Sequence, residues 1–370
     1  MERIKMKVSV LKENLAKALS TCGRVVSTRG SLEILSNVML STEGGRLKVS
    51  ATNLEVGINY WLGAKVEKEG AITVPARLLT DVVNSLTSEK VELEVEELNL
   101  HLKSQNDKLT IKGISVDEFP LIPNIENTSF KISSKVLREA LNLVNFAAAL
   151  DEARPVLSGV YLNIDGDKLT FAATDSYRLA EKVIKLDKKI TDKYEIIIPA
   201  RALIELARTL GDFEEDIKVC INENQILFAA TEVEFTSRLI EGNFPNYQQI
   251  IPENNDTKAI VKASEFAGVL KVASLFAKEN ANSVNIFVRA KGNIEVNATS
   301  SQVGDSSSVV DAEVSGKDGD ISFNSRYILD VLSNLKDEKV EFEISGKLNP
   351  GVIRPEGKKD YTYIIMPLRS

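Results

Sequence analysis

The sequence predicts an α+β protein made of three tandem repeats of one domain, each with two helices packed on antiparallel sheet. Three observations predict this class: a strand-to-helix corner that recurs at a fixed period, two further landmarks that keep the period, and alternating strand patterns between the helices. A period near 124 residues is too long for a solenoid unit and suits a whole domain. The 370 residues, 43% of them hydrophobic, are sufficient for three such cores.

The corner is clearest at residues 196–206, where a run of isoleucine meets Pro199. Proline suits the first position of a helix, because the amide there has no partner within the helix and the ring fixes φ. Apolar residues follow at helical spacing, so a helix is expected directly after the strand. The same corner occurs three times, 124 and 125 residues apart, with an arginine near the start of each helix: Arg77, Arg201 and Arg326.

Two other landmarks keep this period. A strand that ends in threonine recurs 122 and 125 residues apart, at Thr52, Thr174 and Thr299. An apolar residue followed by proline closes each repeat, at Phe119-Pro120, Phe244-Pro245 and Met366-Pro367. The segments after the first two are short, polar and rich in turn residues, so we expect domains that are held in a fixed arc. The expected boundaries are 1–124, 125–254 and 255–370.

Within each repeat the pattern predicts a strand, a helix, several strands, a second helix and more strands. Apolar residues at helical spacing indicate helices at 11–21, 75–86, 133–148, 200–210, 263–278 and 325–336. Alternating apolar residues, as in Val91–Val95 and Val340–Ile344, indicate half-buried strands. Two helices laid on antiparallel sheet give the α+β class.

The residue types of common catalytic and metal sites are scarce. The single histidine, His101, lies in an alternating strand, and with the distant Cys22 and Cys220 it cannot make a zinc site of the usual spacing. Neither of the glycine-rich phosphate loops GxxxxGK[ST] and GxGxxG occurs. We therefore expect no catalytic residue, no metal, no cofactor and no enzymatic activity, and we expect both cysteines to be buried thiols.

No window of the sequence approaches 18 apolar residues, and the N-terminus leads into a strand. The sequence therefore predicts neither a membrane span nor export, and no membrane partner. The expected location is cytoplasmic.

The net charge of −7 argues at first against a nucleic-acid partner, since phosphate binding needs a basic patch. The charge is unevenly distributed, however. The predicted helices carry eleven basic and six acidic residues, so they hold +5 and the remainder holds −12. Helices that share one face would attract phosphates there without distinguishing bases. From charge alone, a general preference of helices for lysine and arginine remains an alternative.

Four segments carry a specific resemblance: ATDSYRLA at 173–180, EGNFPNY at 241–247, YILDVL at 327–332 and MPLR at 366–369. Over its full length the sequence is similar to the bacterial sliding clamps, the beta subunits of DNA polymerase III. This resemblance implies a head-to-tail homodimer, in which two arcs of three domains close a ring around duplex DNA. Twelve helices would line the hole, and continuous sheets would form the rim. The ring would tether the replicative DNA polymerase, the clamp loader and other proteins with a clamp-binding motif.

The resemblance also implies site residues. A partner-peptide pocket between the second and third domains would be formed by Leu157, Thr174, Tyr177, Arg178, Leu179, Pro245, Asn324, Tyr327, Leu348, Met366, Pro367, Leu368 and Arg369. Two loop arginines and the basic helix residues would face DNA: Arg29, Arg77, Arg138, Arg154, Arg201, Arg208, Lys271 and Lys278. The dimer contact would be made by Leu109, Ile111, Leu275 and Phe276.

Two departures from the family pattern bear on the pocket. Ser176-Tyr177 stands where the family often has Gly-His, and Gln248-Gln249 stands where a basic residue often follows the tyrosine. Tyr177 is larger than histidine and cannot become cationic, so the peptide preference is expected to differ. For Phe276 a place in the core of its own domain remains an alternative. The alternative function is a three-domain protein-interaction scaffold that does not encircle DNA.

Overall fold

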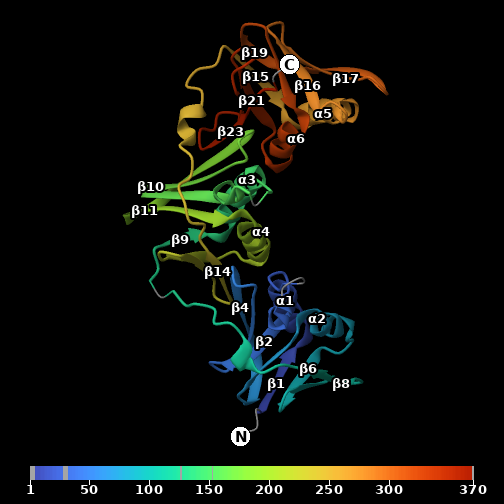
Figure 1. Ribbon diagram of the computed structural model, residues 1–370, viewed down its shortest axis with the longest axis vertical. Coiled ribbons are helices and arrows are strands. Elements are labelled where there is room, and N and C mark those ends of the chain that lie inside the picture. Colours follow the sequence, from blue (N-terminus) through green and yellow to red (C-terminus); the bar gives the residue numbers. More distant parts are fainter. Residues whose placement is uncertain (1–4, 28–31, 126, 152, 369–370) are drawn as a thin grey trace. The chain divides into compact units, whose positions relative to one another are not determined.

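The computed structural model describes residues 5–27, 32–125, 127–151 and 153–368 (Figure 1). It contains two compact units. The first consists of residues 1–137 and 205–239, and the second of residues 138–204 and 240–370. The chain passes between the units three times: within helix α3 (Ser134–Val144), within helix α4 (Ala200–Thr209) and between Leu239 and Ile240.

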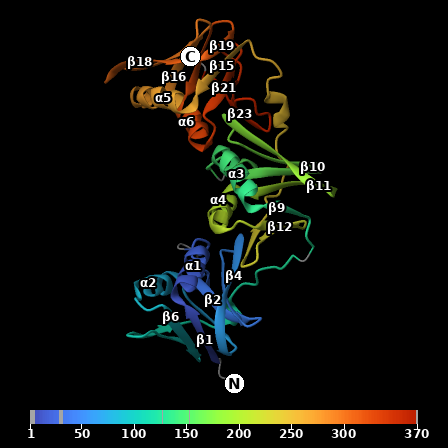
Figure 2. The same ribbon diagram turned by 180° about the vertical axis from the view of Figure 1, so that it is seen from behind.

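The first unit is built on a 12-stranded antiparallel sheet with the order β8-β7-β6-β1-β4-β14-β13-β12-β9, to which β3, β2 and β5 are joined through β4. Helices α1 (Lys12–Cys22) and α2 (Ala76–Ser85) lie side by side on this sheet (Figures 1 and 2). The strands are β1 (Lys5–Leu11), β2 (Asn37–Glu43), β3 (Arg46–Thr52), β4 (Val56–Lys68), β5 (Ala71–Pro75), β6 (Lys90–Glu96), β7 (Asn99–Lys103), β8 (Lys108–Lys112), β9 (Phe130–Ser133), β12 (Asp216–Ile221), β13 (Gln225–Ala229) and β14 (Val233–Arg238).

The second unit has a seven-stranded sheet with the order β10-β11-β23-β22-β21-β15-β19 and a four-stranded sheet with the order β18-β17-β16-β20. Helices α5 (Ala263–Ala277) and α6 (Ser325–Asn334) pack against each other. The strands are β10 (Gly159–Thr174), β11 (Arg178–Pro199), β15 (Thr257–Lys262), β16 (Ser283–Arg289), β17 (Asn293–Ser300), β18 (Gly304–Asp311), β19 (Glu313–Gly316), β20 (Gly319–Asn324), β21 (Lys339–Ile344), β22 (Gly351–Pro355) and β23 (Tyr361–Ile365).

The three strand-to-helix corners share one pairing pattern. The last strand residue before the helix pairs with the first residue of a neighbouring strand: Pro75 with Asn37, Pro199 with Gly159 and Asn324 with Ser283. Helix α2 begins at Ala76, one residue later than predicted, because Pro75 is still extended with a ψ of 117°. Helices α4 and α6 begin at the predicted residues 200 and 325. In the third corner the Oδ1 of Asn324 accepts a hydrogen bond from the N–H of Arg326 at 3.0 Å and caps the helix.

The first helix of each repeat is also anchored in one way. Its first backbone N–H donates to the carbonyl of a glutamate that immediately precedes a strand: Lys12 to Glu89 (2.8 Å), Ser134 to Glu215 (3.0 Å) and Ala263 to Glu338 (2.9 Å). The amides of a first helical turn have no partner within the helix, so a strand carbonyl satisfies one of them here. The sequence repeat is therefore accompanied by equivalent hydrogen bonds at the start of the first helix of each repeat. The predicted α+β class with three repeats is confirmed.

Backbone pairing joins each repeat to the next. At the first junction β4 pairs with β14, from Val56 with Ser237 to Tyr60 with Val233. At the second junction β11 pairs with β23, from Arg178 with Ile365 to Lys182 with Tyr361. Both junctions use the strand that follows the threonine landmark, so a sheet continues across each junction by main-chain hydrogen bonds.

The two cysteines and the single histidine have the surroundings of structural residues. Cys22 and Cys220 are free and buried, as predicted, and burial raises the pKa of the Cys22 thiol. The Nδ1 of His101 lies 2.9 Å from the Oγ1 of Thr110 on the neighbouring strand. In the described part of the chain, no cluster of potential ligand side chains could hold a metal ion, and no helix is long and apolar enough to cross a membrane.

The core of the third repeat contains three fully buried phenylalanines. The ring centroid of Phe342 lies 5.6 Å from that of Phe266 and 6.2 Å from that of Phe323. Phe342 therefore joins helix α5 to the strands β20 and β21.

We expect Phe342→Ala to lower the free energy of unfolding by about 3–5 kcal/mol, because it removes contacts with both rings and leaves a cavity. Urea unfolding followed by circular dichroism measures the loss. Phe287→Ala, at a half-buried ring on β16, is the matched control and should cost clearly less. Equal losses from the two variants would show that Phe342 has no special place in this core.

Candidate functional site

The chain's C-terminal segment crosses the second junction. The N–H of Met366 donates to the carbonyl of Tyr177 at 2.9 Å, and the N–H of Leu368 donates to the carbonyl of Ser322 at 2.8 Å. Pro367 lies between these two bonds. The segment is therefore fastened to the second repeat at one point and to the third repeat at the other.

The turn before β11 owes its shape to two side chains. The Oγ1 of Thr174 donates to the carbonyl of Arg178 at 2.6 Å and accepts from the N–H of Ser176 at 3.1 Å. The Oδ1 of Asp175 accepts from the N–H groups of Tyr177 and Arg178 at 2.9 and 3.0 Å. These bonds hold Ser176 at a φ of +79°, a region that non-glycine residues seldom occupy. The turn leaves the ring of Tyr177 exposed beside the C-terminal segment.

The guanidinium of Arg178 joins this turn to helix α6. Its Nε donates to the Oδ2 of Asp175 at 3.0 Å, and its Nη1 donates to the Oδ2 of Asp330. It lies over two rings, 4.7 Å from the centroid of Tyr327 and 5.6 Å from that of Phe146. Burial acts to lower the pKa of Arg178, but its neighbours raise it by more, so the net shift is upward. Arg178 is thus a largely buried cation, paired with two carboxylates, that fixes the position of the turn.

An apolar cluster lies beneath the turn. Leu179 is fully buried there and packs with Tyr247 and Ile364. The rings of Tyr161 and Phe244 stack beside it with centroids 5.1 Å apart. The hydroxyl of Tyr247 donates to the Oε2 of Glu181 at 2.6 Å, and burial together with this carboxylate raises the pKa of Tyr247. The floor of the site is therefore a packed apolar layer that holds a polar contact between Tyr247 and Glu181.

The structure brings most of the predicted pocket residues to this junction. Contacts connect Thr174, Tyr177, Arg178, Leu179, Tyr327, Met366 and Leu368, as described above. Asn324 caps helix α6, the helix that contains Tyr327.

Three further predicted pocket residues, Leu157, Pro245 and Leu348, lie outside the α-helices and strands. Leu157 is half-buried in the short 3-10 helix η4 (Pro155–Ser158), and Pro245 is exposed next to Phe244. Leu348 is 74% exposed, so it is no core residue. Arg369 lies outside the described residues.

The residues predicted to face DNA fall into two groups. Those on helices are mostly at the surface: Arg77, Arg201, Arg208, Lys271 and Lys278 are exposed, and Arg138 is half-buried. Arg77 has the acidic neighbour Asp81 at 4.0 Å, and Arg208 pairs with Glu205 at 2.7 Å. Arg29 lies outside the described residues.

Arg154 differs from the helix residues. Its guanidinium donates to the Oδ2 of Asp151 at 3.0 Å, to the Oγ of Ser176 at 3.0 Å and to the carbonyl of Asp175 at 3.3 Å. It therefore supports the turn of the second junction, and its role toward DNA stays a prediction.

The residues predicted for the dimer contact lie at or near sheet edges. Leu109 and Ile111 are on β8, the last strand of its sheet, but Ile111 is only 5% exposed and offers little surface. Leu275, 60% exposed, and the half-buried Phe276 are on α5, which packs against β17 and the edge strand β18.

Sequence reasoning missed several residues of these sites. The exposed Val303 and Val309 lie just before and on the edge strand β18, but its serine-rich sequence gives no clear apolar alternation. Asp330 lies within one of the family-like segments, yet its pairing with Arg178 spans 152 residues of sequence and leaves no local trace. The hydroxyl of Tyr363, which donates to the carbonyl of Tyr327 at 2.9 Å, makes another contact between residues that are not neighbours in sequence, 36 residues apart.

Comparisons with known proteins agree along the whole chain. The family models of the DNA polymerase III beta subunit match in three parts: the N-terminal domain at residues 6–123, the central domain at 131–246 and the C-terminal domain at 248–369. The chain is 30% identical over 376 residues to the beta sliding clamp of Staphylococcus aureus, covering 99% of this chain and 100% of that protein.

Two solved structures give the same result. The sliding clamp from Bacillus subtilis matches with a TM-score of 0.94 and 29% identity, covering 99% of both chains. The DNA polymerase III subunit beta from Pseudomonas aeruginosa matches with a TM-score of 0.92 and 28% identity, covering 98% of this chain and 100% of that one.

We expect Arg178→Met to loosen the turn at the second junction. Asp175, whose side chain is 14% exposed, would lose its cationic partner, at a cost of roughly 2 kcal/mol. The loss stays below that of a fully buried ion pair because Asp330 is 45% exposed. Hydrogen exchange of residues 174–182, followed by mass spectrometry, should become faster.

Arg326→Met removes an exposed arginine at the start of α6 and serves as the control. It should leave this exchange unchanged. Unchanged exchange in Arg178→Met would mean that the turn keeps its shape without the arginine.

Proposed function

The chain belongs to the DNA polymerase III beta subunit family, the beta sliding clamps, and from this premise we propose that it is a non-catalytic processivity factor. It encircles duplex DNA and tethers the replicative DNA polymerase, and it acts in the cytoplasm. The observation that carries the proposal is that three repeats, matched to sliding-clamp domains along the whole chain, are joined by the same strand pairing at both junctions. The domain division 1–124, 125–254 and 255–370 is proposed with it.

The ring closes in this proposal through a head-to-tail homodimer. A head-to-tail contact generates a ring only when its rotation closes the circle, and a chain of similar domains repeats nearly the same rotation at each step. Two edge strands of opposite charge support this contact. β8 carries the exposed Lys108 and Lys112, whereas β18 carries the exposed Asp305 and Asp311. Pairing these edges would also cover the exposed apolar side chains Leu109, Leu275 and Val309.

The contact with DNA is electrostatic and independent of base sequence. The exposed basic residues of the helices, Arg77, Arg201, Arg208, Lys271 and Lys278, supply charge for phosphates. Because a closed ring retains DNA by topology, each contact can be weak. An acidic protein can therefore slide on a polyanion without being expelled from it.

Partner proteins bind at the second junction through short peptides. The replicative polymerase, the clamp loader and other proteins with a clamp-binding motif would share this site. Met366 and Leu368 have half-buried side chains, and their backbone is fixed by the bonds to Tyr177 and Ser322. A surface whose backbone is fixed in advance binds a peptide without a large ordering cost.

We expect the protein, once loaded on nicked circular duplex DNA, to stay bound through gel filtration and to be released when the circle is linearised. The double variant Leu275→Ala/Phe276→Ala should be a monomer by light scattering and should not be retained, because it cannot close the ring. Leu78→Ala, at an exposed leucine of α2, is the control and should stay dimeric. Equal retention on linear DNA with free ends would rule out topological binding and favour a scaffold.

We expect the double variant Met366→Ala/Leu368→Ala to bind the C-terminal peptide of its replicative polymerase at least about tenfold more weakly. The side chains are lost, but the two backbone bonds of the segment can still form. Fluorescence anisotropy with a labelled peptide measures the change, and light scattering should show an intact dimer. Leu150→Ala, at a highly exposed leucine, is the control; an affinity unchanged in the double variant would exclude the segment from the site.

A further inference from the structure

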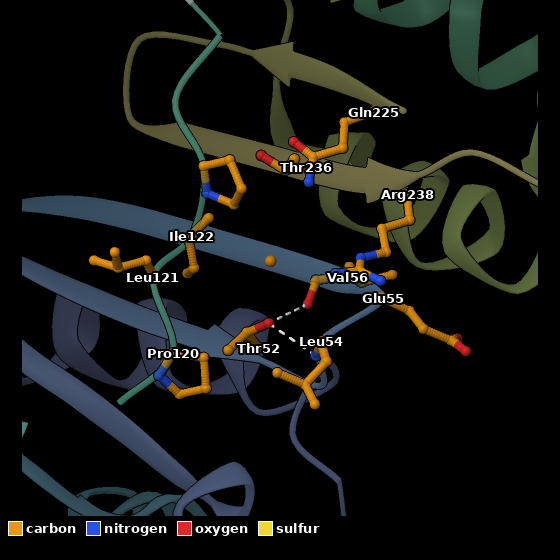
Figure 3. A pocket seen from close by; sticks show the side chains of 12 residues that line it. Thr52, Leu54, Glu55, Val56, Pro120, Leu121, Ile122, Gln225, Thr236 and Arg238 are labelled. Atoms are coloured by element: carbon orange, nitrogen blue, oxygen red, sulfur yellow. Dashed lines mark hydrogen bonds between the residues drawn. The ribbon is translucent and has the colours of Figure 1, made fainter. Parts of the chain in front are cut away.

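A pocket lies at the first junction, entirely within the first unit (Figure 3). Its cavity measures about 80 Å³. Three segments line it: the turn at residues 52–57, the segment 120–123, and β13 and β14 through Gln225, Thr236 and Arg238.

The turn at this pocket has the hydrogen bonds of the turn at the second junction. The Oγ1 of Thr52 donates to the carbonyl of Val56 at 2.8 Å and accepts from the N–H of Leu54 at 3.1 Å. Leu54 has a φ of +76°, close to the +79° of Ser176. The two junctions therefore present the same backbone.

A fastening bond is repeated as well. The N–H of Arg238 donates to the carbonyl of Glu55 at 2.8 Å, as the N–H of Met366 donates to that of Tyr177. In position, Arg238 thus corresponds to Met366, and Glu55 corresponds to Tyr177. The first junction has a counterpart for each of these contacts of the second.

Two small side chains stand at the pairing position of the first junction. Gly57 pairs with Thr236 there, at the place where Leu179 pairs with Ile364 in the second junction. The side chain of Ile122 packs directly on Gly57, since a Cβ on this glycine would lie 2.7 Å from the Cγ2 of Ile122. The cavity is therefore the space that Ile122 leaves beside Thr236 and the turn at residues 52–57.

The surroundings of the cavity define the chemistry of an occupant. Leu54 and Leu121 are exposed apolar side chains on its rim, and Leu121 is 96% exposed. Among the residues that the structure describes, no carboxylate lies within ion-pair distance of the exposed guanidinium of Arg238. Figure 3 shows the carboxylate of Glu55 pointing away from the pocket. The site thus offers a small apolar space beside an uncompensated cation.

We propose that this pocket is a second, weaker peptide site, which takes an aliphatic side chain in the cavity between Ile122 and Thr236 and a neighbouring carboxylate on Arg238. Its occupant is an extended segment of a partner protein with an acidic residue next to a leucine. The proposal rests on the proposed function in one respect, that junctions of this fold bind peptides. The cavity and the free cation are properties of the first unit itself.

The test uses the full-length protein with labelled methyl groups and the synthetic peptide acetyl-Ser-Asp-Leu-Ser-amide. We expect the methyl NMR signals of Leu54 and Ile122 to shift saturably as the peptide is added. The peptide with asparagine in place of aspartate should bind about tenfold more weakly, because it loses the charge-assisted bond.

Two variants locate the binding. Thr236→Ile supplies the residue type that fills the second junction and should abolish the shifts. Arg238→Gln should weaken binding about tenfold, to the level of the asparagine peptide. Lys218→Gln makes the same change of charge at an exposed position of β12 and should have no effect. If Thr236→Ile fails to fold, Arg238→Gln and the asparagine peptide still decide the question.

The absence of a saturable shift at Ile122 in the unmodified protein would overturn the proposal. Binding that persists in a folded Thr236→Ile would also overturn it, because the peptide would then lie elsewhere. The proposed function is tested by other signals. If the methyl groups of Met366 and Leu368 fail to respond to the polymerase peptide, the second junction has no such role, whatever Ile122 shows.

Discussion

Main-chain pairing between repeats is the interaction on which the rest of the structure depends. β4 with β14 and β11 with β23 each continue a sheet across a junction. Main-chain hydrogen bonds require no particular side chain, so the two junctions can share a backbone and differ in what they display. The second has Leu179 and Ile364 where the first has Gly57 and Thr236. One scaffold thus presents two large apolar side chains at one junction, and a glycine covered by Ile122 at the other.

Basic residues have two different roles in this protein, which depend on whether they are covered or exposed to water. Arg178 is buried, stacked on two rings and paired with two carboxylates, so its contribution is to hold a turn in one geometry. The basic residues at the helix surface, such as Arg77 and Lys271, remain in contact with water. Exposed charges act over a distance that salt shortens, which suits a partner that moves past them.

The sequence was sufficient for the features that depend on local pattern. The helices follow from apolar spacing, and the three corners follow from strand runs that end in proline or asparagine. The errors are small and physical. The helix predicted to end at residue 148 stops at Val144, because the chain tightens into the 3-10 helix η3 (Asn145–Ala147). The backbone of Pro75 belongs to strand β5, so α2 begins at Ala76 and not at residue 75.

The sequence predicted those parts of the candidate sites that lie within one short motif, but not the contacts between distant segments. The motif around Thr174 was visible in the sequence. The pairing of Arg178 with Asp330, however, joins two repeats and has no local pattern. Arg154 was assigned to DNA from its loop, whereas its bonds to Asp175 and Ser176 appear only in three dimensions. The pocket at the first junction had no sequence pattern at all, since its lining comes from three segments that are far apart in the sequence.

The bonds that begin the first helix of each repeat make the two helices of a repeat unequal in what substitutions they tolerate. The backbone N–H groups of Lys12, Ser134 and Ala263 each have a carbonyl partner, so proline at any of these positions would remove a bond that connects helix to sheet. In the first two repeats the second helix follows Pro75 or Pro199, so proline is accepted at that corner. In the third repeat the N–H of Ser325 donates to the carbonyl of Asn282 at 2.9 Å, and Asn324 takes the place of the proline. Proline should therefore be tolerated where the second helix of the first two repeats begins, but not at the first residue of any of the first helices.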